Sequence, residues 1–173
     1  MSRNEWLDTL PKGSVGAEIG VAAANYYLEM LQRVKPKLLY LVDRYAFIEN
    51  KSARNKKELL MHVAMSNVAR GIFDGIVRPL CAFSLDVAKW MPDETLDWVY
   101  IDADHKPKSV YDDVTAWYPK VKVGGIVSGH DYKEGLGPYS GANDAVKAIQ
   151  PGTKINVIDP ENRTPSFWFR REA

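Results

Sequence analysis

The chain has 173 residues, of which 46% are hydrophobic and 26% are charged, and its formal net charge is +1. This length and mixture are typical of one globular domain, and the balanced charge argues against a general attraction to nucleic acid or to an anionic membrane. The single cysteine, Cys81, excludes an internal disulfide and is typical of a reducing compartment.

The first ten residues carry acids and a tryptophan rather than a cationic segment followed by an apolar run. They do not resemble a signal peptide, and no stretch reaches the ~18 apolar residues of a membrane span. No internal repeat is visible. We therefore expect one domain over residues 1–173, a cytoplasmic location, and neither a nucleic-acid nor a membrane partner.

Short apolar runs alternate with helical patterns along most of the chain. The predicted strands are 15–19, 38–42, 76–80, 98–101 and 126–128, and the predicted helices are 22–34, 57–70, 110–118 and 143–149. This alternation predicts a doubly wound, mostly parallel α/β sheet with right-handed crossovers. Pro79 cannot donate to a strand ladder, so the third strand is expected at the sheet edge. The apolar runs 155–158 and 167–169 flank a polar turn and predict an antiparallel C-terminal hairpin, which brings the sheet to seven strands.

Acidic or histidine side chains follow four of the predicted strands. They are Glu18 with Gly20, then Asp43, then Asp102 with Asp104 and His105, and finally His130 with Asp131. The carboxyl ends of parallel strands share one edge of the sheet, and open α/β sheets bind their ligands at that edge. An acid after a strand is often only a helix cap, but the same choice after four strands favours a binding site.

The first strand, a glycine, a helix and then an acid after the second strand form a nucleotide-binding pattern. Gly20 permits close approach of the backbone to a ligand, and Asp43 is placed to accept hydrogen bonds from a ribose. A dinucleotide pyrophosphate requires several glycines here, whereas residues 20–24 contain one glycine and three alanines. Glu18 would also repel phosphates. The pattern therefore favours the cationic cofactor S-adenosylmethionine.

The same residues resemble a known family. Residues 18–21 and 41–43 look like the first two motifs of class I S-adenosylmethionine-dependent methyltransferases. Residues 84–88, 96–105, 113–117 and 124–132 are similar to its small-molecule branch, which includes macrocin-type sugar O-methyltransferases and cephalosporin-hydroxylase-like proteins. The resemblance runs from about Val15 to Val146, and it implies the Rossmann-like methyltransferase fold.

The resemblance also assigns the cofactor contacts. It implies that Glu18 and Gly20 hold the methionine part of the cofactor, that Asp43 holds the ribose, and that Phe83 and Ser84 lie near the adenine. Ala24 stands where the family usually has a glycine.

The resemblance places Asp102 at the methyl-transfer centre and His105 on the acceptor side. His105 is the candidate general base, because an imidazole side chain gains and loses its proton near neutral pH. In metal-using relatives the acids after the fourth and fifth strands bind magnesium, which points to Asp102 and Asp131. His130 stands where those relatives carry an acid, and Pro107 replaces a common aromatic residue. The sequence does not decide whether His105 or a bound metal activates the acceptor.

The predicted function is O-methylation of a small hydroxylated molecule. Two alternatives are a nicotinamide-dependent oxidoreductase and a cofactor-binding protein without its own activity, such as a partner subunit. Residues 45–51 and 133–141 are expected to be loops, the second a mobile gate on the acceptor side. The sequence identifies neither the methyl acceptor nor the oligomeric state, and a homo-oligomer is one of the alternatives.

Overall fold

The computed structural model describes residues 1–45 and 51–173, and for residues 51–57 it describes the backbone alone. The strands are β1 (Val15–Ile19), β2 (Leu38–Asp43), β3 (Val77–Cys81), β4 (Leu96–Ile101), β5 (Val121–Gly129), β6 (Asn156–Ile158) and β7 (Ser166–Arg170). The helices are α1 (Arg3–Leu7), α2 (Tyr26–Val34), α3 (Lys51–Phe73), α4 (Ser84–Trp90), α5 (Pro107–Trp117), the 3₁₀ helix η1 (Tyr118–Lys120) and α6 (Gly137–Ile149). In the described residues, no helix has the length and hydropathy of a transmembrane segment.

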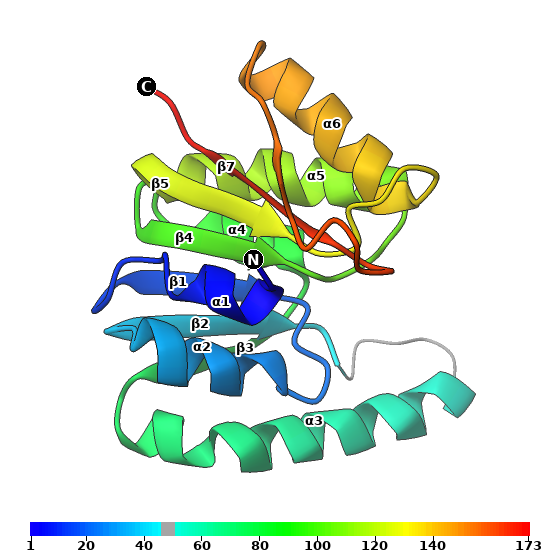
Figure 1. Ribbon diagram of the computed structural model, residues 1–173. Coiled ribbons are helices and arrows are strands. Elements are labelled where there is room, and N and C mark those ends of the chain that lie inside the picture. The colour runs from blue at the N-terminus through cyan, green and yellow to red at the C-terminus, as the bar shows by residue number, and fades with distance from the viewer. Residues whose placement is uncertain (46–50) are drawn as a thin grey trace.

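The strands form one sheet in the order β3-β2-β1-β4-β5-β7-β6 (Figure 1). The pairs among β1 to β5 are parallel, whereas β7 runs antiparallel to both β5 and β6. The predicted doubly wound sheet with an antiparallel C-terminal hairpin is therefore confirmed. Pro79 lies in β3 at the edge of the sheet, as predicted.

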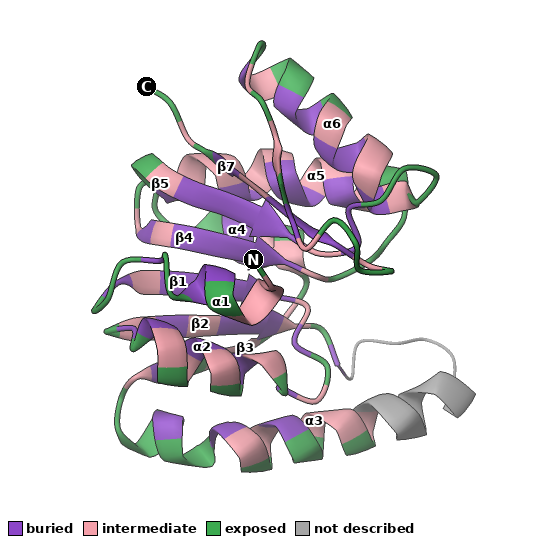
Figure 2. Cartoon of the chain, in the orientation of Figure 1, coloured by how far each residue is buried: buried purple, intermediate pink, exposed green. Residues whose placement is uncertain are grey.

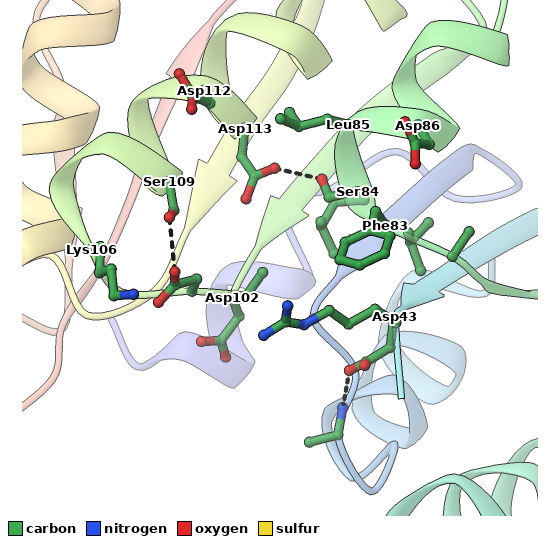
Figure 3. Close-up of a pocket in the computed structure, with 18 of the residues that line it drawn as sticks. Asp43, Phe83, Ser84, Leu85, Asp86, Asp102, Lys106, Ser109, Asp112 and Asp113 are labelled. Carbon is green, nitrogen blue, oxygen red and sulfur yellow. Dashed lines mark hydrogen bonds between the residues drawn. The ribbon is translucent and has the colours of Figure 1, made fainter. Parts of the chain in front are cut away.

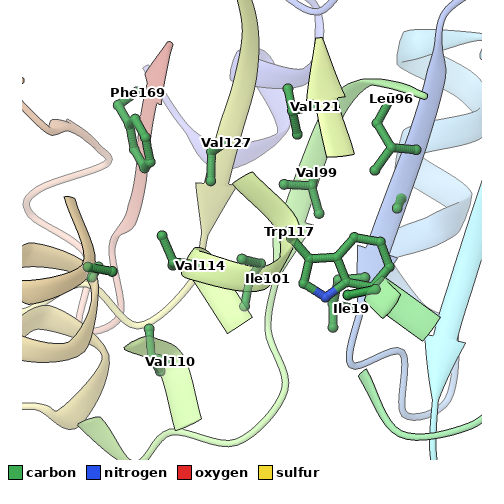
Figure 4. Close-up of a cluster of buried hydrophobic side chains, with 14 of the residues drawn as sticks. Ile19, Leu96, Val99, Ile101, Val110, Val114, Trp117, Val121, Val127 and Phe169 are labelled. Atoms are coloured by element: carbon green, nitrogen blue, oxygen red, sulfur yellow. The ribbon is translucent and has the colours of Figure 1, made fainter. Parts of the chain in front are cut away.

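Alternate residues of the central strands pack into two different cores, one on each face of the sheet (Figures 1 and 2). Trp98 and Tyr100 of β4 join the core beneath α1, α2 and α3. Val99 and Ile101 join the core beneath α4, α5 and α6, where Trp117 is the largest side chain (Figure 4). Because both faces are covered, the carboxyl-end edge is where polar side chains of these strands meet solvent.

Several element boundaries differ from the predicted ones. The sequence patterns did not predict α1 and α4, which are short helices of five and seven residues.

The segment predicted as a loop from Lys133 to Gly141 is already helical from Gly137, so the gate prediction was wrong over residues 137–141. The physical reason is close packing. A Cβ at Gly137 would lie 2.0 Å from the His105 carbonyl oxygen, and one at Gly141 would lie 2.3 Å from that of Pro107. The missing side chains of these glycines let α6 pack closely against the start of α5, so the glycines do not indicate a flexible loop. Residues 46–50 of the other predicted loop lie outside the described residues.

Candidate functional site

A cavity of about 710 Å³ opens at the carboxyl ends of β1, β2 and β4 (Figure 3). It lies at the topological switch point, where the chain continues outward from β1 in one direction and from β4 in the other. Most of the predicted cofactor residues line it, namely Gly20, Asp43, Phe83, Ser84 and Asp102. The structure therefore brings together residues that are far apart in the sequence.

Gly20 lies in close contact with the backbone of the segment that follows β4. Its φ is +89°, and a Cβ at this position would lie 2.2 Å from the Asp102 carbonyl oxygen. Its N–H donates to the Val42 carbonyl at 2.8 Å, and the Asp102 N–H donates to the Ile19 carbonyl at 2.7 Å. No other residue fits here, and the glycine lets the ends of β1, β2 and β4 converge.

Asp43 closes the loop between β1 and α2. Its Oδ2 accepts hydrogen bonds from the N–H groups of Val21 and Ala22, both at 3.0 Å, and its Oδ1 accepts one from Tyr45 at 2.9 Å. Figure 3 shows Asp43 accepting a hydrogen bond at the cavity wall. Three backbone N–H groups thus fix the carboxylate at the cavity wall.

Glu18 is 3% exposed, and its Oε2 has no hydrogen-bond partner within the part of the chain that the structure describes. Burial raises the pKa of this carboxyl well above its ordinary value, and the nearby Asp102 adds to the shift. A buried acid without a partner is costly unless a cationic or donating group binds it. Glu18 does not itself line the cavity, although it lies two residues before Gly20, which does.

The side chains at the start of α4 and on α5 form a second wall of the cavity. Ser84 donates to Asp113 Oδ1 at 2.5 Å (Figure 3). It also accepts a hydrogen bond from the Trp117 indole N–H at 2.8 Å. Burial raises the pKa of Asp113 to about 6. The Phe83 side chain is 44% exposed, and the Arg44 guanidinium lies 5.7 Å from its ring centroid.

Two acids and two histidines gather after β4 and β5. His105 Nδ1 lies 2.9 Å from Asp131 Oδ2, and its Nε2 lies 3.6 Å from Asp102 Oδ1. His130 Nδ1 lies 3.3 Å from Asp131 Oδ1 and 3.7 Å from Asp102 Oδ1. We call these four residues the Asp–His cluster. His105 is the most accessible member, with 54% of its side chain exposed.

Burial and mutual charge set the protonation of this cluster. Burial raises the pKa of Asp102 above its usual value, and the imidazole of His130 opposes that rise. Burial lowers the pKa of His130, so this imidazole is favoured in its neutral form at pH 7. Asp131, 7% exposed, contacts both histidines.

Sequence reasoning missed two polar residues near this edge. Asp113 belongs to a motif that carried the resemblance, but its burial was not foreseen. Arg3 comes from α1, and its charge acts on Asp102 and Glu18. No pattern in the sequence connects the first residues of the chain with the end of β4, because the contact depends on how α1 packs through Trp6 and Leu7.

This fold and cavity define the class: a Rossmann-like α/β protein with a ligand cavity at its switch point. Within that class, a family model of methyltransferase domains matches residues 17–132, more than half of the chain. The chain therefore belongs to this methyltransferase domain family. A search of curated proteins found no match. The finer assignment to the macrocin-type branch stays a prediction.

Solved methyltransferases share the fold at low identity. An rRNA methylase from Streptococcus thermophilus is 10% identical, with a TM-score of 0.68 over 98% of this chain and 94% of that chain. A precorrin-6y C5,15-methyltransferase from Geobacter metallireducens is 13% identical, with a TM-score of 0.68 over 95% and 83%. TYW2 from M. jannaschii, solved in complex with AdoMet, is 14% identical, with a TM-score of 0.61 over 96% and 74%.

Proposed function

We propose that the protein transfers a methyl group from S-adenosylmethionine to a hydroxyl group of a small molecule. The observation that carries this proposal is the cavity at the switch point, which joins the ends of β1, β2 and β4 to the Asp–His cluster. Membership of the methyltransferase domain family supports it. The macrocin-type resemblance supports the choice of a hydroxyl acceptor.

The residues that line the cavity, together with Glu18 beside it, suit this cofactor. The unpartnered Oε2 of Glu18 is a buried acceptor that the cofactor's ammonium group would satisfy. Gly20 supplies the close backbone approach for the methionine part, and Asp43 supplies a fixed acceptor for the ribose hydroxyls. Phe83 and Ser84 also line the cavity and would contact the adenine.

His105 is the proposed general base. Its Nδ1 faces Asp131 at 2.9 Å, and in that arrangement Asp131 holds the ring as hydrogen-bond acceptor while Nε2 is left for the acceptor proton. Asp102 lines the cavity and contacts this ring, so it sits between cofactor and base. The sulfonium supplies an already activated methyl group. The chain's task is to align the acceptor oxygen and to remove its proton, which passes to His105.

A divalent cation on Asp102 and Asp131 is the alternative way to activate the acceptor. One ligand atom each from Asp102, His105 and Asp131 lies within 4.8 Å of the others, so the residues fit a cation. Bound there, such a cation would lower the pKa of an acceptor hydroxyl. The imidazole donor suits manganese, iron or zinc better than magnesium, which prefers oxygen ligands.

Two other functions are less well supported. A nicotinamide-dependent oxidoreductase needs a glycine-rich pyrophosphate loop, whereas Ala22 and Ala24 occupy positive-φ positions here without being glycine. A cofactor-binding protein without its own activity shares every feature of the cavity, and it differs only in lacking turnover.

Titration calorimetry with S-adenosylhomocysteine and with NAD⁺ tests the cofactor. We expect binding of S-adenosylhomocysteine alone, and weaker binding in Asp43→Ala, with Asp93→Ala as a control because that acid is exposed and pairs with Lys120. An absence of binding to both S-adenosylhomocysteine and S-adenosylmethionine would overturn the proposal.

A second assay tests turnover. The protein is incubated with S-adenosylmethionine and a pool of small hydroxylated compounds, and mass spectrometry follows products heavier by one methylene group. Methylated product is the expected result. Tight cofactor binding without product would favour the protein that lacks its own activity.

A further inference from the structure

A second, smaller cavity of about 180 Å³ lies beside the Asp–His cluster. It is lined by Arg3, His130, Asp159, Asn162, Thr164 and Ser166. These residues come from α1, from the residue that follows β5, from the turn between β6 and β7, and from the start of β7. His130 lines this cavity, Asp102 lines the larger one, and the two side chains are 3.7 Å apart. The cluster is therefore reached from both cavities.

The lining of the smaller cavity selects a polar ligand. All six side chains that line it are polar, and they include a guanidinium, an imidazole, an amide and two hydroxyls. Its volume is below the ~300–1,000 Å³ of a typical drug-sized pocket, so it holds a small molecule or one end of a larger one. An apolar tail or a bare aromatic ring would leave these groups without partners.

Arg3 is the distinctive residue of this cavity. Of the arginines whose burial is described, Arg3, Arg33 and Arg171 are half-buried. Arg33 and Arg171 each lie within 4.0 Å of a carboxylate, whereas Arg3 has no such ion pair among the described residues. A partly desolvated guanidinium without a carboxylate partner is well suited to bind an anionic group.

Two tyrosines hold the Arg3 guanidinium in place. It lies 4.0 Å from the centroid of the Tyr26 ring and interacts with the Tyr100 hydroxyl. The Tyr100 hydroxyl also lies 3.0 Å from Ser166 Oγ, which lines the same cavity. A guanidinium that is fixed before binding loses less entropy when a ligand arrives.

We propose that the methyl acceptor is a small hydroxy acid whose carboxylate binds Arg3 in the smaller cavity while its hydroxyl reaches the Asp–His cluster. This inference rests on the proposed function. A single carboxylate suits the site better than a dianionic phosphate, because Asp159 contributes a negative charge to the same cavity. Asn162 donates to Asp159 Oδ2 at 3.2 Å, so that charge is held in place.

The test compares three probes of similar size: glycerate, glyceramide and glycerol. Each is titrated by calorimetry into the whole protein saturated with S-adenosylhomocysteine. We expect glycerate to bind at least about tenfold more tightly than either neutral probe. We expect Arg3→Gln to abolish this preference, Arg3→Lys to keep part of it, and Arg78→Gln, which removes an exposed arginine from β3, to keep all of it.

The result separates this inference from the proposed function. Equal affinity for the three probes, no binding of glycerate, or a glycerate preference that survives in Arg3→Gln would each overturn the hydroxy-acid site. The first step of the titration, saturation with S-adenosylhomocysteine, tests the cofactor independently. The Arg3→Lys variant and the thermal midpoint of each variant show whether α1 stays packed.

Discussion

At the residue scale, His105 has the geometry of a base that another side chain orients. Asp131 lies 2.9 Å from its Nδ1, and 54% of the His105 side chain is exposed. We expect His105→Ala to lower the rate of methyl transfer by ~10²–10⁴-fold, the usual contribution of general base catalysis, and to leave the affinity for S-adenosylhomocysteine unchanged. Single-turnover kinetics and calorimetry measure the two quantities.

The matched control for this prediction is His62→Ala. His62 is an exposed residue of α3 whose ring contacts the Glu58 carbonyl oxygen of the same helix. A full rate in His105→Ala, combined with a large loss in His130→Ala, would show that His130 is the general base instead.

Asp113 gives a prediction about pH and stability. Burial raises its pKa to about 6 from an ordinary 3.8. The folded state therefore binds more protons than the unfolded state between about pH 4 and pH 6, and this residue lowers the free energy of unfolding as pH rises through that window. Asp113→Asn removes the penalty. It should stabilise the protein at pH 8 by up to about 3 kcal/mol and have little effect at pH 4.

Urea denaturation of parent and variant at both pH values measures this difference. Asp113→Asn keeps an oxygen that accepts the Ser84 hydroxyl bond, so the contact survives the change. A variant equally destabilised at both pH values would show that the negative charge itself is needed for packing.

At the element scale, the sequence predicted the five parallel strands because apolar runs alternate with helical patterns. It predicted the edge position of β3 from Pro79, and the hairpin from two apolar runs around a polar turn. It did not predict α1 and α4, since helices of five and seven residues carry too little periodicity. The start of α6 was misplaced because Gly137 and Gly141 were interpreted as flexible residues, whereas they allow close contact with the start of α5.

The convergence of β1 and β4 gives the prediction that belongs to this scale. A Cβ at Gly20 would overlap the Asp102 carbonyl, and its φ of +89° disfavours any other residue. Gly20→Ala should lower the free energy of unfolding by roughly 2–5 kcal/mol and weaken the binding of S-adenosylhomocysteine. Denaturation and calorimetry measure both.

Gly75→Ala is the matched control. Gly75 also has a positive φ, +73°, but a Cβ there would meet no atom of the described residues within 4 Å. This control should lose only about 1–2 kcal/mol and keep full cofactor affinity. Equal losses in the two variants would mean that backbone conformation, and not contact with Asp102, dominates at Gly20.

At the scale of the whole molecule, the candidate site was predictable in outline because strand ends of a parallel sheet share one edge. Glu18, Asp43, Asp102 and His105 could be assigned to that edge from strand order alone. Arg3 could not, because its position depends on how the first helix packs against the sheet. Contacts that join distant segments through packing, rather than through the sheet, leave no local signal in the sequence.

The larger cavity joins segments from both halves of the sheet, and this gives the last prediction. Its walls come from residues 19–22, 42–44, 82–89 and 102–113, whereas β6 and β7 contribute none of the residues that line it. Saturation with S-adenosylhomocysteine should therefore slow amide hydrogen exchange in these four segments together, since one ligand contacts both halves. Exchange in residues 156–158 and 166–170 should change little. Mass spectrometry of the exchanged peptides, with and without ligand, measures this pattern. Protection confined to one half of the sheet, or strongest in the C-terminal hairpin, would place the cofactor elsewhere.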